Sequence, residues 1–216
     1  RFYALEEVVL PDTLEAIEYG AFFNCTSLKS VKGLEHVKLI NQSAFQNTAL
    51  NGTYNLDSAV AIASHAFRDC TNLDKVVLGK NTISVGDYAF ASTSINNVSI
   101  PDGVEIGNGA FAECLTLEAI VIGDNVTIGS YAFGLSTNDH TGNWELIKGD
   151  DGYYRYKFAS PIHSLTIGNN VIIGNRAFYS AYELESVTLG EGATIGSFAF
   201  YNACSLKSID LSKVKT

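Results

Sequence analysis

The chain has 216 residues, of which 46% are apolar and 17% are charged, a composition typical of a folded protein and not of a disordered one. Its net charge of −9 and its 14 Lys and Arg residues argue against nucleic-acid binding and against docking on an anionic membrane, because both need clustered positive charge. No run of about 18 apolar residues occurs, so no membrane insertion is expected.

Eight Ala-Phe pairs divide the chain at nearly constant intervals. Their phenylalanines are Phe22, Phe45, Phe67, Phe90, Phe111, Phe133, Phe178 and Phe200. The intervals are 23, 22, 23, 21, 22, 45 and 22 residues, so one period spans the chain with a single gap of double length. A fixed period of this size is typical of a solenoid, and it predicts that these eight rings form the structural core.

The clearest unit reads INNVSIPDGVEIGNGAFAEC at residues 95–114. Alternating apolar residues predict a short strand over 95–100 and a second extended piece over 104–106. Pro-Asp-Gly at 101–103 predicts a turn between them. Residues 108–113 are expected to form a tight helical or 3₁₀ turn that carries the Ala-Phe pair inward.

The same pattern recurs in chain order and predicts a parallel sheet of about nine short strands. Their apolar positions are Leu5/Val8/Leu10, Leu28/Val31, Leu50/Tyr54/Leu56, Leu73/Val76/Leu78, Ile95/Val98/Ile100, Leu117/Ile120/Ile122, Ile162/Leu165/Ile167, Leu184/Val187/Leu189 and Leu206/Ile209/Leu211. The unit from residue 28 has Gly33 where the strand should end on an apolar residue, and the unit from residue 50 carries an extra residue before Tyr54. Coils stacked about 4.8 Å apart would bury one continuous core.

The unit CLTLEAIVIGDNVTIGSYAF at residues 114–133 resembles the BspA-like, or Treponema-type, leucine-rich repeat family. The family pattern is approximately C-x-x-L-x-x-I-x-I-P-x-x-V-x-x-I-G-x-x-A-F-x-x-C. This resemblance implies a right-handed coil and a single array over residues 1–216, expected to be a piece of a longer protein. It also implies a secreted or surface-attached bacterial protein, with adhesion to host matrix proteins or other cells as the expected role.

The four cysteines allow a disulfide, a metal site or buried free thiols. Cys25, Cys70 and Cys114 each follow a repeat phenylalanine by three residues, and Cys204 follows one by four. Cysteines in alternate coils would lie about 10 Å apart, beyond the α-carbon separation that a disulfide permits. Free thiols facing the core are therefore predicted.

The doubled interval predicts an insertion over residues 134–160, in which two β-prone runs flank a Gly-Asp-Asp-Gly turn as in a hairpin. Its candidate binding residues are Trp144, Tyr153, Tyr154, Arg155 and Tyr156, residue types that are frequent in interface hot spots. Two interpretations stay open: the rings contact a protein partner, or they fold back and cover the flank of the array. Stacking on sugar rings would make the chain a carbohydrate-binding module instead, and buried rings would leave a purely structural spacer.

A second candidate surface is the exposed side of the predicted strands, which is small, largely neutral and free of aromatic residues. By alternation its positions are Glu7, Val9, Ser30, Lys32, Thr53, Asn55, Lys75, Val77, Asn97, Ser99, Ala119, Val121, Ser164, Thr166, Ser186, Thr188, Ser208 and Asp210. It suits a flat hydrogen-bonding contact or simple solvation, and it lacks hot-spot anchors.

No catalytic or ligating constellation occurs in the sequence. The histidines at 36, 65, 140 and 163 lack metal-binding spacing, and neither a nucleophile elbow nor a phosphate loop is present. We therefore expect no enzyme activity, no metal and no cofactor, and the sequence favours a non-enzymatic binding module.

Overall fold

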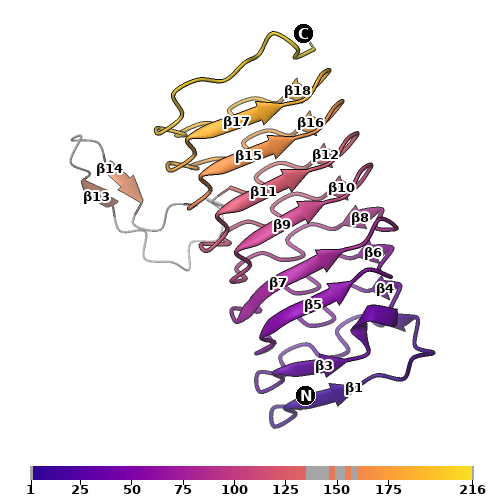
Figure 1. The fold of residues 1–216 in the computed structure, drawn as a ribbon. Coiled ribbons are helices and arrows are strands. Elements are labelled where there is room, and N and C mark those ends of the chain that lie inside the picture. Colours follow the sequence, from indigo (N-terminus) through magenta and orange to yellow (C-terminus); the bar gives the residue numbers. More distant parts are fainter. Residues whose placement is uncertain (1, 135–145, 149–153, 157–159, 216) are drawn as a thin grey trace.

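The computed structural model describes residues 2–134, 146–148, 154–156 and 160–215. The chain winds into a stack of coils that runs from the N-terminus to the C-terminus (Figure 1). Each coil contributes one longer strand and one two-residue strand, and both series of strands pair in parallel with their counterparts one coil away. The predicted repeat solenoid is confirmed.

The longer strands occupy eight of the nine predicted positions. They are β1 (Glu7–Val9), β3 (Ser30–Lys32), β5 (Gly52–Leu56), β7 (Leu73–Leu78), β9 (Asn97–Ile100), β11 (Ala119–Ile122), β15 (Ser164–Ile167) and β17 (Ser186–Leu189). The two-residue strands form one eight-stranded sheet. They are β2 (Ala16–Ile17), β4 (Leu39–Ile40), β6 (Ala61–Ile62), β8 (Ser84–Val85), β10 (Glu105–Ile106), β12 (Thr127–Ile128), β16 (Ile172–Ile173) and β18 (Thr194–Ile195).

The sequence predicted one parallel sheet of longer strands. In the structure these strands form three sheets: β1–β3, β5–β7 and β9–β11–β15–β17. Between β3 and β5, the Tyr54 hydroxyl accepts a hydrogen bond from the Val31 amide at 3.3 Å and donates one to the Lys29 carbonyl at 3.4 Å. A phenol thus satisfies backbone groups of β3 that a neighbouring strand would otherwise pair. The 3₁₀-helix η1 (Leu34–His36), which begins after Gly33, lengthens the same coil.

The strand predicted over residues 206–211 is absent. The chain just beyond this segment bonds at the turn edge, where Gly192 N donates to Lys213 O at 2.9 Å and Lys215 N donates to Ala193 O at 2.8 Å. The Ser212 amide donates to the Asp210 carboxylate at 2.9 Å, which turns the chain away from a strand path. Leu211 is accordingly 51% exposed and not part of the core.

The eight repeat phenylalanines form a single column. Successive ring centroids are 5.2–5.4 Å apart and successive rings are tilted by 3–15°. Phe133 and Phe178, which flank the insertion, are as close as any other pair, at 5.3 Å and 3°. The insertion therefore leaves the array without interrupting it. Burial of each ring stabilises the fold by roughly 1.5–3 kcal/mol, and Phe22 and Phe200 at the two ends of the column are only partly buried.

The turns that carry these rings are not helical, which corrects the predicted helical or 3₁₀ conformation. Left-handed residues lie two positions before and two after the phenylalanine, as at Ser43 (φ 55) and Asn47 (φ 56) around Phe45. This alternation directs every second amide to the next coil, so that Phe45 N donates to Ala66 O at 2.8 Å. Within the described chain, η1 is the one 3₁₀-helix, and it lies outside these turns.

Glycine is required where neighbouring coils touch at the I-G corner. A β-carbon on Gly129 would lie 2.6 Å from the carbonyl carbon of Gly107, closer than real contacts allow. Beside these glycines, the Asn108 side-chain oxygen accepts a hydrogen bond from the Ser130 amide at 2.9 Å. The repeated Ile-Gly motif thus allows neighbouring coils to approach closely, and a side-chain hydrogen bond joins the coils beside it.

Three of the four cysteines are buried free thiols, as predicted, whereas Cys204 is exposed. Thr48 and Thr93 occupy the intervening coils, and their hydroxyls lie 3.2 Å from the Cys70 sulfur and 3.3 Å from the Cys114 sulfur. Burial raises the pKa of the Cys70 and Cys114 thiols to about 11. Among the described residues, no helix is long and apolar enough to cross a membrane.

Candidate binding surfaces

The predicted hairpin is present in its backbone. β13 (Leu146–Lys148) and β14 (Tyr154–Tyr156) pair antiparallel, with Ile147 opposite Arg155. This pair forms a sheet of its own beside the array, level with β11 and β15 (Figure 1). Trp144 and Tyr153, and the side chains of the residues in β14, lie outside the described residues, so their binding role stays a prediction.

The strand face is flat and polar in its C-terminal half. The outward positions of β9, β15 and β17 are Asn, Ser and Thr, and those of β11 are Ala119 and Val121. All of these are exposed, as the alternation predicted. The regular spacing of short side chains offers hydrogen-bonding groups but no anchor that would fill a partner's pocket.

A third surface lies on the Phe-bearing turns of three successive coils in the C-terminal half. We call it the aromatic–arginine cluster, and its members are Tyr131, Arg176, Tyr179, Phe198 and Tyr201. Phe198 is 58% exposed and Tyr201 is 47% exposed, while the other three are partly buried. The sequence analysis missed these residues, because they occupy the variable positions of the repeat.

Arg176 lies at the centre of the cluster. Its guanidinium carbon is 5.6 Å from the Tyr131 ring centroid and 5.2 Å from that of Phe198, both within cation–π range. The Arg176 Nη1 atom donates to the Tyr131 hydroxyl at 2.9 Å. These three contacts hold the long arginine side chain in one place.

The tyrosines that follow the repeat phenylalanines complete the cluster. Tyr179 and Tyr201 stack with centroids 5.4 Å apart and a tilt of 12°, which matches the separation of neighbouring coils. Tyr131 is tilted against Tyr179 at 5.9 Å, and Phe198 meets Tyr201 edge to face at 5.8 Å. The cluster is thus a connected set of rings built from residues up to 70 positions apart in the sequence.

The backbone of the repeat positions these side chains. Tyr131, Arg176 and Phe198 all have left-handed φ angles, of 56°, 54° and 58°. His65 and Tyr88 occupy the same repeat position with φ of 61° and 55°, so the conformation belongs to every coil and not to the cluster alone. What distinguishes the C-terminal coils is therefore the size and type of the side chains that they display.

An equivalent but smaller group lies on the same turns nearer the N-terminus. His65 and Tyr88 stack at 5.6 Å, and the Arg68 guanidinium lies 5.7 Å from the Tyr88 ring. Here the arginine is paired with an acid, since its Nε lies 3.5 Å from the Asp69 carboxylate. Desolvation, followed by the positive charge of Arg68, lowers the pKa of His65.

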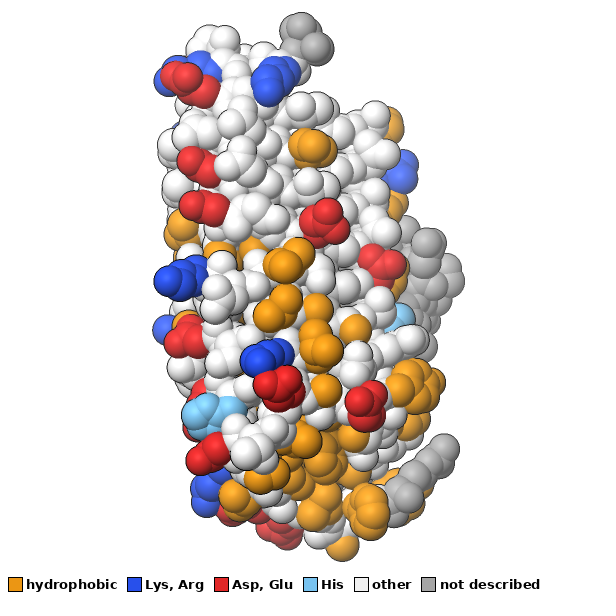
Figure 2. Space-filling model, turned by 90° about the vertical axis from the view of Figure 1, so that its right-hand side faces the viewer, with side chains coloured by type: hydrophobic (Ala, Val, Ile, Leu, Met, Phe, Trp, Pro, Cys, Tyr) orange, Lys and Arg blue, Asp and Glu red, His pale blue; other side chains and the backbone are white. Residues whose placement is uncertain are grey.

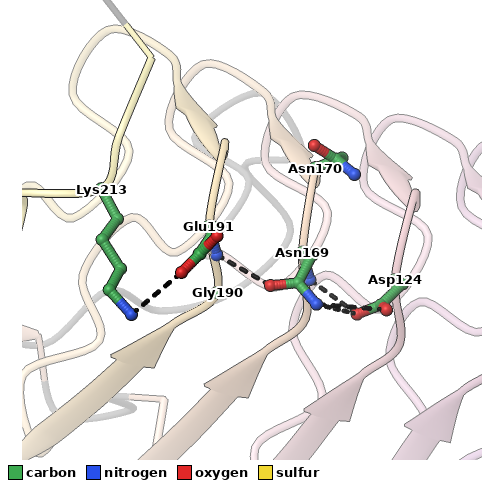
Figure 3. Close-up of a pocket in the computed structure, with 6 residues that line it drawn as sticks. All are labelled: Asp124, Asn169, Asn170, Gly190, Glu191 and Lys213. Carbon is green, nitrogen blue, oxygen red and sulfur yellow. Dashed lines mark hydrogen bonds and ion pairs between the residues drawn. The ribbon is translucent and has the colours of Figure 1, made fainter.

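A shallow polar hollow of about 590 Å³ opens at the turn edge between the last coils (Figure 3). Its lining residues are Asp124, Asn169, Asn170, Gly190, Glu191 and Lys213. The Asp124 carboxylate accepts from the Asn169 amide at 2.6 Å, and the Asn169 side-chain oxygen accepts from the Glu191 amide at 2.8 Å. Lys213 in turn pairs with Glu191 at 3.4 Å. The polar groups that line the hollow bond to one another. We therefore interpret them as a row of hydrogen bonds that stabilises the turns.

The side of the array that carries these turns also exposes apolar residues. Figure 2 shows them gathered over its N-terminal half. Leu39 in β4 is 42% exposed, and Ile83, next to β8, is 61% exposed. In the described part of the chain, no group of three or more His, Cys, Asp or Glu residues is placed to hold a metal ion.

Comparison with known proteins identifies the family of this repeat. A family profile described as "BspA type Leucine rich repeat region (6 copies)" matches residues 2–114, 38–141 and 150–216. The chain belongs to the BspA-type leucine-rich repeat family. Among curated proteins, no sequence matches it significantly.

Solved structures of bacterial leucine-rich repeat proteins match the chain, and the one with a TM-score above 0.5 shares its fold. A leucine-rich repeat protein from Eubacterium ventriosum matches with a TM-score of 0.61 at 17% identity, over 95% of this chain and 54% of that one. A leucine rich cell surface protein from Faecalibacterium prausnitzii matches at 22% identity with a TM-score of 0.43, over 95% of this chain and 66% of that one. The pneumococcal vaccine antigen PcpA matches at 17% identity with a TM-score of 0.38, over 96% of this chain and 60% of that one. The chain thus spans only part of the length of these relatives.

Proposed function

We propose that this chain is a non-enzymatic protein-binding module of a secreted or cell-surface bacterial protein, and that its partner is a host matrix or cell-surface protein. The observation that carries the proposal is the aromatic–arginine cluster. Tyrosine and arginine are among the residue types most enriched in binding hot spots, and here they lie in one connected group whose exposed members are Phe198 and Tyr201.

The array supports binding because it holds the cluster in place before a partner arrives. Tyr131 N donates to Asn175 O at 3.1 Å, and Arg176 N donates to Ser197 O at 3.0 Å, so the three coils are joined by backbone hydrogen bonds at the cluster itself. The phenylalanine column continues beneath it from Phe133 to Phe200. A preorganised surface loses little conformational entropy on association.

The test is a binding assay of the purified chain against a panel of extracellular-matrix proteins and an array of glycans. The cluster variant carries Phe198→Asn and Tyr201→Ser, and asparagine suits the left-handed backbone at position 198. The hairpin variant carries Trp144→Ala and Tyr154→Ala. Lys80→Gln serves as the control because it alters an exposed side chain outside the three candidate surfaces.

Binding to a matrix protein that falls at least about tenfold in the cluster variant and is unchanged in the control would support the proposal. Loss in the hairpin variant alone would move the contact to the insertion, as one interpretation of the sequence predicts. Binding to glycans without binding to proteins would make the chain a carbohydrate-binding module. Absence of binding to either panel would favour a structural spacer.

A further inference from the structure

Among the described residues, no Asp or Glu forms an ion pair with Arg176. The turn segments that build the cluster, residues 130–134, 175–180 and 197–202, contain no Asp or Glu, and Arg176 is their one charged residue. In the described part of the chain, its side chain contacts the Tyr131 hydroxyl and two aromatic rings. A guanidinium has five N–H donors, so most of its capacity to bind a carboxylate is unused.

The arginine in the smaller group provides the contrast. Arg68 lies against Tyr88 in the same way, but Asp69 supplies a carboxylate 3.5 Å from its Nε. The chain as a whole has an excess of acidic residues, with a net charge of −9. The lack of acids is therefore a feature of the three turn segments that carry the cluster, and an incoming carboxylate would complement Arg176.

The packing of the rings indicates what kind of ligand carries that carboxylate. Stacking of a pyranose needs an open ring face, but Tyr179 and Tyr201 place faces against each other and the Arg176 guanidinium covers one face of Phe198. What the cluster offers is the exposed parts of Phe198 and Tyr201 together with the remaining guanidinium donors of Arg176. These groups suit the side chains and backbone of a peptide better than they suit a sugar ring.

We infer that the aromatic–arginine cluster binds an acidic peptide segment of the protein partner, and this inference rests on the function proposed above. An Asp or Glu side chain of the partner pairs with Arg176, and a neighbouring apolar side chain packs on Phe198 and Tyr201. The negative net charge of the chain opposes this only weakly at contact, because the screening length at physiological salt is about 8 Å.

The experiment is selection of a random dodecapeptide phage library on the immobilised chain, followed by fluorescence anisotropy with the enriched peptides. We expect enrichment of sequences that contain Asp or Glu next to an apolar residue. Arg176→Gln should weaken their binding at least about tenfold, because it removes both the charge and the bidentate donor. Lys80→Gln removes the same charge from an exposed site elsewhere and should leave binding unchanged.

Three results would overturn the inference. They are enrichment of neutral or basic peptides, equal loss in the Arg176 and Lys80 variants, and binding of oligogalacturonate, an acidic glycan, in place of acidic peptides. If the Phe198→Asn, Tyr201→Ser variant loses binding to a matrix protein while acidic peptides are not selected, the proposed function stands and the acidic partner does not. If no matrix protein binds at all, the proposed function fails independently of the peptide result.

Discussion

Replacing one ring of the phenylalanine column by alanine tests whether the coils act as a linear array. Phe90 is fully buried and lies between Phe67 and Phe111, with both centroid separations at 5.2 Å. Phe200 is partly buried and stacks on Phe178 alone among the described residues, at 5.4 Å. Because the stability of a solenoid is approximately a sum over coils and their interfaces, the two positions should differ.

Phe90→Ala should lower the free energy of unfolding by about 3–5 kcal/mol, the range for a buried Phe-to-Ala cavity. Phe200→Ala removes a single ring contact at a partly buried position. We therefore expect about half of that loss in unfolding free energy, roughly 1.5–2.5 kcal/mol. The comparison isolates position in the column, since the chemical change is the same.

The assay is urea denaturation followed by far-ultraviolet circular dichroism for both variants and the unaltered chain. An equal loss in the two variants, or a larger loss for Phe200→Ala, would refute the reasoning. Either result would mean that the end coil contributes as much as an inner coil, and that the sum over neighbouring interfaces does not describe this array.

Three further predictions concern individual side chains. In the native state, one thiol of the four, that of Cys204, should react with a thiol reagent, because the others are buried and the pKa values of Cys70 and Cys114 are about 11; rapid reaction of a second thiol before denaturant is added would contradict this. Tyr54→Phe should cost about 1–3 kcal/mol in urea unfolding, since it leaves the Val31 amide and the Lys29 carbonyl without their partner, and a neutral effect would show that the hydroxyl is dispensable. The folded-state pKa of His65 lies below its unfolded value of 6.5, so the unfolded chain binds the proton first and stability should fall as pH drops below about 6.5. His65→Asn, which the left-handed backbone accepts, should reduce that fall, and an unchanged slope of stability against pH would refute the assignment.

The array itself was predictable because one phenylalanine in each repeat fixes the register of the coils. A phenylalanine at each interval of 21 to 23 residues leaves one way to stack the coils, and the doubled interval marks the insertion. The sheet breaks were not predictable from the same pattern. The break between β3 and β5 depends on a hydroxyl that reaches a strand 23 residues earlier, and the extra residue before Tyr54 was the local sign that this coil differs. Residues 206–211 have the apolar alternation of a strand but do not form one, because the Asp210 carboxylate accepts from the Ser212 amide and the chain beyond it bonds to residues 192 and 193 at the turn edge.

The aromatic–arginine cluster shows what a repeat pattern hides. A repeat consensus describes only the positions that recur, so it does not predict which residues occupy the variable positions. Tyr131, Arg176 and Phe198 all stand at the same variable position, two before the repeat phenylalanine, and Tyr179 and Tyr201 stand directly after it. Once the coils are stacked, these positions become two adjacent columns on one face, so their residue types must be compared down the columns and not along the chain. The insertion leaves the array at Gly134. This residue directly follows a repeat phenylalanine, as Tyr179 does in the next coil. The insertion therefore begins in the coil that contributes Tyr131 to the cluster.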